Sequence, residues 1–158
     1  MKFLIMILSF MLTQMLYAER MKVTSSFMEA GEKDIRFIGN TKRSVNDSWV
    51  QADNIIVYLD DNNETRMYEA TGLVSIEIIG ENHSFKGRAN TVIYDKWKSR
   101  YILRGNVMID DNDFIMKRHV KGDEIVLNMM TGKMHVKGGP LTTKLFIKLN
   151  DFSRAFGF

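Results

Sequence analysis

The sequence contains no cysteine and only one proline among its 158 residues. The absence of cysteine excludes disulfide bonds and a thiolate nucleophile, and any zinc site would have to use histidines and carboxylates alone. An excess of one charge is also lacking, since 22 basic residues stand against 19 acidic residues and the two signs are interspersed. Because nucleic-acid-binding proteins concentrate positive charge in a patch or stripe, we expect no nucleic-acid partner. The hydrophobic share of 45% is typical of a globular domain rather than a disordered or collagen-like chain.

Recognisable catalytic and metal-binding motifs are also missing. The sequence has no Gly-x-Ser-x-Gly elbow, no P-loop and no dinucleotide fingerprint. The three histidines, His83, His119 and His135, are isolated from one another. The segment Asp60-x-Asn62-x-Glu64 resembles the start of an EF-hand loop, but the glycine and the glutamate that such a loop needs later are absent, which favours a hairpin tip. We therefore expect no enzyme, no metal site and no cofactor.

Residues 1–18 have the order of a secretory signal peptide. Lys2 precedes an apolar run from Phe3 to Leu12, and the segment ends at the small residue Ala18. This pattern predicts export and cleavage after Ala18, which leaves residues 19–158 as a single domain. A retained membrane anchor is the alternative, although the apolar stretch is shorter than the roughly 20 residues that cross a bilayer.

A glycine recurs at a fixed interval through the rest of the chain. Gly39, Gly72, Gly105 and Gly138 are each 33 residues from the next. An interval of this length indicates an internal repeat, with units near 35–67, 68–100 and 101–133 and a partial unit from 134. Because one such unit cannot bury its apolar face alone, the units should stack into an elongated domain with a shared core.

The residues around these glycines alternate between apolar and polar with a period of two, which indicates β-strands. A glycine inside a strand marks a bulge or bend, so each strand should turn a corner there. Clusters of Asn, Asp and Gly between the strands predict tight turns. The fold class is therefore all-β, and the following residues should share its interior face: Phe37, Ala70, Val74, Ile76, Leu103, Val107, Ile109 and Val136.

A stack of β units leaves a strand unpaired at each end. The first strand, near residues 21–28, and the last, near 142–149, are apolar and carry few charges. Unpaired edges of this kind invite pairing with another chain, which predicts head-to-tail association. The residues expected to add burial at these edges are Val23, Phe27, Leu145 and Ile147.

An exported β protein without a catalytic constellation is suited to binding or scaffolding. If the two sides of the stack splay apart, the apolar face becomes a slot that suits acyl chains. A structural or adhesive protein with a closed, fully packed interior and no ligand is the alternative.

Three segments resemble the repeats of the lipopolysaccharide-transport periplasmic protein family, LptA (also called OstA). They are Gly39-Asn40 with Trp49-Val50-Gln51-Ala52-Asp53-Asn54-Ile55, Gly72-Leu73-Val74-Ser75-Ile76 with Lys86-Gly87-Arg88-Ala89-Asn90, and Arg104-Gly105-Asn106-Val107 with Lys121-Gly122-Asp123-Glu124-Ile125. The resemblance implies a twisted, open β-jellyroll in the periplasm whose interior shelters the lipid A acyl chains of lipopolysaccharide. It also implies end-to-end assembly into a bridge from the inner to the outer membrane, with LptC-like and LptD-like jellyrolls as partners. A retained N-terminal anchor would instead favour an LptC-like protein of the inner membrane.

Overall fold

The computed structural model describes residues 21–79, 83–113, 116–138 and 142–147, which form one ten-stranded antiparallel sheet without a helix. The strands are β1 (Met21–Thr24), β2 (Phe27–Ala30), β3 (Asp34–Val45), β4 (Ser48–Leu59), β5 (Thr65–Ile79), β6 (His83–Asp95), β7 (Arg100–Asp113), β8 (Met116–Asn128), β9 (Met134–Lys137) and β10 (Thr142–Ile147). Among these residues, no helix is long and apolar enough to cross a membrane. The predicted signal peptide, residues 1–18, lies outside the described part of the chain.

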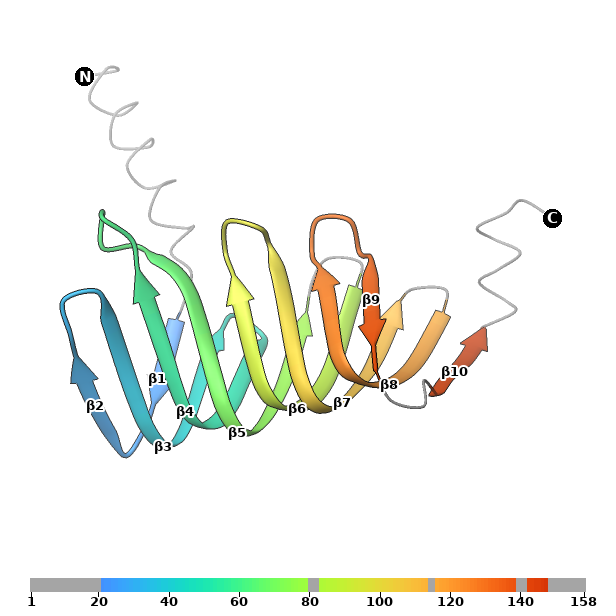
Figure 1. Cartoon of the computed structure of the whole chain (residues 1–158), viewed down its shortest axis with the longest axis horizontal. Coiled ribbons are helices and arrows are strands. Elements are labelled where there is room, and N and C mark those ends of the chain that lie inside the picture. The colour runs from blue at the N-terminus through green and yellow to red at the C-terminus, as the bar shows by residue number, and fades with distance from the viewer. Residues whose placement is uncertain (1–20, 80–82, 114–115, 139–141, 148–158) are drawn as a thin grey trace, which may run out of the picture.

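The strands follow one another up and down in chain order. β3 to β8 pair successively, and each antiparallel pair extends over most of both strands. Two short strands cover each end of this series, because β1 and β2 both pair with β3, and β9 and β10 both pair with β8. Figure 1 shows the resulting row of strands from the blue N-terminal end to the red C-terminal end.

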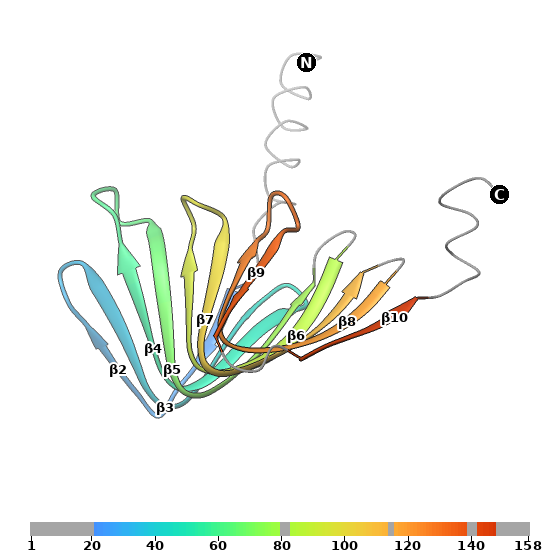
Figure 2. The same cartoon turned by 45° about the vertical axis from the view of Figure 1, so that its right-hand side comes forward.

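The sheet is folded along a line that crosses every long strand near its middle, as Figures 1 and 2 show. Gly39, Gly72 and Gly105 have φ angles of 80°, 82° and 76°, and the residue after each also has a positive φ. The strand register shifts at each of these points. Two successive left-handed residues bend a strand sharply, and glycine reaches this conformation at little cost. The predicted corners at these three glycines are therefore confirmed.

The fold line divides the sheet into two walls that enclose a trough. We call the strand halves flanked by β2 and β9 the first wall, and those flanked by β1 and β10 the second wall. Hairpin turns at residues 31–33, 60–64, 96–99 and 129–133 connect the strands along the rim of the first wall (Figure 2). One of them contains Asp60, whose carboxylate accepts hydrogen bonds from the backbone N–H groups of Asn62 and Glu64, both at 2.9 Å. This segment is a hairpin tip, as predicted, and its aspartate is occupied by its own turn.

The core lies between the walls. Ala70, Leu103 and Ile109 are 0% exposed, and Val74, Ile76 and Val107 are 1% exposed. Phe37 and Val136 are partly buried and pack against this cluster. Each of the residues expected on the interior face thus faces the space between the walls.

The edges differ from the expected single strands. The segment 21–28 is interrupted at Ser25 and Ser26, so that β1 lies on the second wall and β2 on the first. At the other end β9 occupies the first wall and β10 the second, while residues 148 and 149 lie outside the described residues. The N-terminal edge segment also has to cross the fold line, and its strand pairing with β3 is interrupted there, between Thr24 and Phe27.

Candidate functional site

The inner surface of the trough is built from cross-strand rows that the register defines. On the second wall one row contains Val23, Arg43, Val50, Ile76, Gly87, Ile109 and Val120. On the first wall the corresponding row contains Ile35, Val57, Tyr68, Tyr94, Tyr101, Leu127 and Met134. Because residues paired directly across an antiparallel sheet point to the same face, both rows line the trough. These two rows are therefore apolar, apart from the tyrosine hydroxyls and Arg43.

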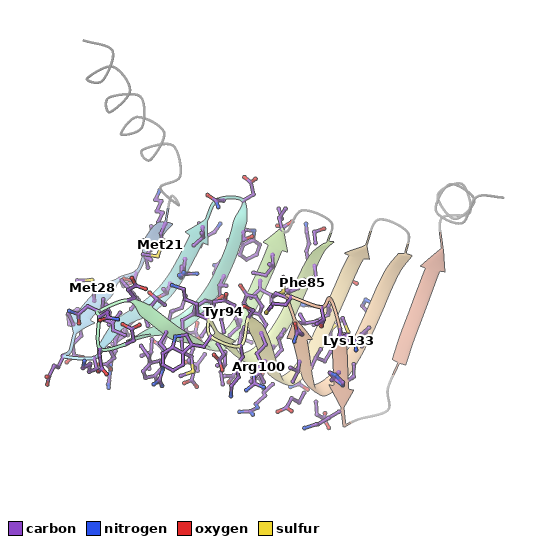
Figure 3. The ribbon with its side chains drawn as sticks, turned by 90° about the horizontal axis from the view of Figure 1, so that it is seen from above. Met21, Met28, Phe85, Tyr94, Arg100 and Lys133 are labelled. Carbon is purple, nitrogen blue, oxygen red and sulfur yellow. The ribbon has the colours of Figure 1, made fainter. Side chains whose placement is uncertain are left out.

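Aromatic rings fill the middle of the trough. The ring centroid of Tyr94 lies 5.3 Å from that of Tyr68 and 4.6 Å from that of Tyr101. Phe85 reaches from the second wall and meets the Tyr101 ring edge-on at 6.0 Å. Figure 3 shows Tyr94 and Phe85 near the middle of the molecule, between Met21 and Met28 at one end and Lys133 towards the other. All of these contacts have the separations that aromatic pairs prefer, and the contact between Phe85 and Tyr101 links the two walls.

Arg43 also crosses the trough from the second wall. Its guanidinium carbon lies 4.7 Å from the centroid of the Tyr68 ring on the first wall. The neighbouring Lys42 points outward instead, and its ammonium lies 5.0 Å from the Trp49 ring centroid. Neither Arg43 nor the tyrosine cluster was predicted from the sequence. The 33-residue interval would have indicated Arg43. This residue stands four positions after Gly39, just as Ile76 follows Gly72 and Ile109 follows Gly105.

An open pocket of about 560 Å³ lies between the walls beside these residues. The second wall contributes apolar side chains and Arg43, and the first wall contributes the tyrosines with Glu64 and Lys96 at its rim. The residues that line it are Met21, Arg43, Val45, Asn46, Ser48, Trp49, Val50, Glu64, Thr65, Tyr68, Ile78, Ile79, Tyr94, Lys96 and Tyr101. A concave pocket in which apolar side chains and several polar groups converge has the character of a ligand site.

Burial raises the pKa of two tyrosine hydroxyls in the pocket. Burial raises the pKa of Tyr68 well above its ordinary value, and the neighbouring Tyr101 raises it further. The pKa of Tyr101 is raised by its own burial as well. Both side chains therefore remain hydrogen-bond donors at neutral pH and above it, because a buried phenolate would lose its hydration.

The outer faces of the walls are polar and carry ion pairs. Glu77 accepts a hydrogen bond from the Trp49 indole at 2.9 Å and pairs with Lys86 at 3.1 Å, and these contacts, Lys86 first, lower the pKa of Glu77. Arg104 and Lys137 pair with Glu124 at 2.7 and 3.3 Å and lower its pKa in the same way. The contrast with the inner rows shows that the apolar surface is directed into the trough.

The isolated histidines have separate environments. His119 contacts Asp110 on the outer face, and His135 is exposed. The side chain of His83 is not among those that the structure describes. In the described ranges, no three His, Cys, Asp or Glu side chains are grouped so that they could hold a metal ion.

The residues proposed for end-to-end docking lie on the two edges. Val23 on β1 pairs with Arg43 and faces the trough, whereas Phe27 on β2 pairs with Ile38 on the outer face and is 60% exposed. Leu145 and Ile147 pair along β10 with Arg118 and Met116, and their side chains lie outside the described residues.

The fold has a counterpart among solved structures. LptH, the LptA homologous periplasmic component of the lipopolysaccharide transport device from Pseudomonas aeruginosa, superposes with a TM-score of 0.66 and 12% sequence identity. The match covers 82% of this chain and 96% of the LptH chain. The similarity confirms the predicted all-β, open jellyroll fold.

Comparison of the sequence identifies the family. No curated protein matches the chain significantly. The family model described as "LptA/(LptD N-terminal domain) LPS transport protein" matches residues 17–133, well over half of the chain. The chain therefore belongs to the LptA and LptD N-terminal domain family of lipopolysaccharide transport proteins, which are not enzymes.

Proposed function

We propose that this chain is an exported carrier of lipopolysaccharide that works in the periplasm and shelters the lipid A acyl chains in its trough. The observation that carries the proposal is the continuous apolar inner face with an open pocket between the walls. Removing acyl chains from water contributes about 0.8 kcal/mol for each methylene, so even partial insertion would retain the lipid. Export by the signal peptide, with cleavage after Ala18, belongs to the same proposal.

The packing of the core indicates where the lipid would lie. The innermost candidates, such as Leu103, Val107 and Ile109, are covered by their neighbours in this structure. Acyl chains would therefore either contact the side chains nearer the opening or part the walls to reach the core. Phe37 and Val136, which are only partly buried, are the groove candidates that a lipid reaches first.

Photocrosslinking tests the proposal with a matched pair of adjacent positions. Phe37 faces the trough and Ile38 faces outward, and both are large apolar residues on β3. With a photoreactive aromatic residue at each position in turn, we expect lipopolysaccharide to crosslink several-fold more from position 37 than from position 38. Equal crosslinking would show that the lipid does not use the trough, and absence of crosslinking from every inward position would contradict the carrier function.

We further propose that copies of the chain join end to end, as part of a bridge between the two membranes. Neighbouring strands are antiparallel from one edge of the sheet to the other. On the first wall β9 therefore runs opposite to β2, and on the second wall β10 runs opposite to β1. A second copy placed in line can therefore extend the sheet with antiparallel pairs on both walls. LptC-like and LptD-like jellyrolls would use the same edges.

The N-terminal edge has the features of a docking strand. Met21, Phe27 and Met28 are 59%, 60% and 58% exposed there. The Ser26 N–H donates to the Gly39 carbonyl at 2.9 Å, so the alternation of an antiparallel strand directs the N–H groups of Phe27 and Glu29 away from β3. These donors are available to an incoming strand.

Substitution of Glu29 by proline should block self-association and leave the fold intact. Proline removes a donor that has no partner within the sheet, and edge strands tolerate it. The parent and a Glu29→Ala control should increase in mass with concentration in light scattering, whereas Glu29→Pro should stay monomeric with an unchanged melting temperature. Because only short strands would pair, the association should be weak. If the parent stays monomeric at its highest soluble concentration, self-association is wrong.

A further inference from the structure

Arg43 occupies a position that the repeat otherwise gives to buried isoleucine. It stands four residues after Gly39, and the equivalent Ile76 and Ile109 are 1% and 0% exposed. The register places all three in the same inward-facing row of the second wall. The first repeat thus carries a cation where the others carry core side chains.

Among the described side chains, none balances the charge of Arg43 within the trough. Its side chain is partly buried and lies over the Tyr68 ring, and no described carboxylate is within ion-pair distance. Lys96, the other cation of the pocket, already lies 4.0 Å from Glu64 at the rim. Removing a guanidinium from water without a partner is costly, and a cation interacting with one ring regains only part of that cost. An anionic ligand group would supply the missing partner.

The ring that this cation covers carries a buried hydroxyl. Tyr68 is 1% exposed. The nearby Tyr101 raises the pKa of its hydroxyl, but no described group lies at the distance and angle of a hydrogen bond to that hydroxyl. A guanidinium fork and phenolic donors together match the oxygen atoms of a phosphate group. Val45, Val50 and Ile78 line the same pocket, so the group bound there would belong to an amphiphile.

We propose that Arg43, together with the Tyr68 hydroxyl, binds a phosphate ester of the lipid headgroup while the acyl chains lie along the apolar rows. This inference rests on the proposed function and assigns a polar subsite within it. It also orients the cargo, because the phosphate would lie near the β1 and β2 end of the trough and the acyl chains would extend towards β9 and β10.

Equilibrium binding of two lipids to the mature protein tests the subsite. The probes are phosphorylated lipid A and the same lipid after enzymatic removal of its phosphates, in detergent micelles of one composition. The parent should prefer the phosphorylated lipid by roughly 10- to 100-fold, the range expected for a hydrogen-bonded charge pair. Arg43→Gln should lose this preference and bind the dephosphorylated lipid as the parent does, and Arg43→Lys should restore part of it.

Lys42→Gln provides the matched control, because it removes the same charge from the adjacent residue, which points outward over Trp49. This variant should keep the preference of the parent. An Arg43→Gln variant that weakens binding of both lipids equally would show that Arg43 only supports the fold, and would overturn the subsite. Saturable binding of inorganic phosphate alone, as tight as that of the lipid, would overturn the assignment to a lipid headgroup. If the parent binds neither lipid, the carrier function itself fails.

Discussion

Replacing Val107 with aspartate should destabilise the protein by at least about 3 kcal/mol, because the new carboxylate would be buried without a partner. Val107 is 1% exposed and belongs to the cluster that joins the two walls beside the fold line. A domain of this size is stabilised by only about 5–15 kcal/mol in total, so the loss should appear as a large fall in the urea midpoint. Lipid crosslinking from position 37 should fall with it.

Asn106→Asp provides the control for this change. Asn106 is the exposed neighbour of Val107, so the same carboxylate stays in water there and should alter stability little. The effect of Val107→Asp should also depend on pH. Burial raises the pKa of a carboxyl in the folded state, so the loss of stability should be smallest below about pH 4 and should grow as the pH rises. A urea midpoint that matches the parent at pH 7 would show that this position is not enclosed.

The corners and the interior face were accessible from the sequence because both depend on local chemistry. A glycine at a constant interval within alternating strands has few uses other than a backbone conformation that side chains avoid, and Gly39, Gly72 and Gly105 adopt that conformation. The alternation itself fixes which residues share a face, so Ala70 and Leu103 could be assigned to the interior without knowledge of the register.

Other features depend on distances between segments that are far apart in sequence. Arg43 meets Tyr68 across the trough, and nothing in the residues around either one shows how closely the walls approach. The break between β1 and β2 was also missed, because Ser25 and Ser26 read as ordinary strand residues until the neighbouring β3 is known to bend at Gly39. The extent to which the walls close is likewise set by aromatic packing, such as that of Phe85 on Tyr101, and no local pattern encodes it.

Substitution of Gly105 should show how much the fold line depends on glycine. Its φ is +76°, and a Cβ atom placed there would lie 2.6 Å from the side-chain nitrogen of Asn90 and 2.9 Å from the Asn90 Cβ. Both the backbone conformation and the crowding oppose a side chain. We expect Gly105→Ala to cost about 1–3 kcal/mol of unfolding free energy, and Gly105→Val to cost more because its branched side chain is less tolerant of a positive φ.

The next residue provides a matched control for this prediction. Asn106 also has a positive φ, 50°, and asparagine tolerates this conformation, so Asn106→Gly should change the unfolding free energy by only a few tenths of a kcal/mol. Urea denaturation of Gly105→Ala, Gly105→Val and Asn106→Gly compares the two positions directly. If Gly105→Ala is as stable as the parent, the strand can turn this corner with an ordinary residue, and the 33-residue interval would need a cause other than backbone conformation. If both Gly105 variants are destabilised while Asn106→Gly is not, the bend that holds the walls apart depends on the absence of a side chain at this one position.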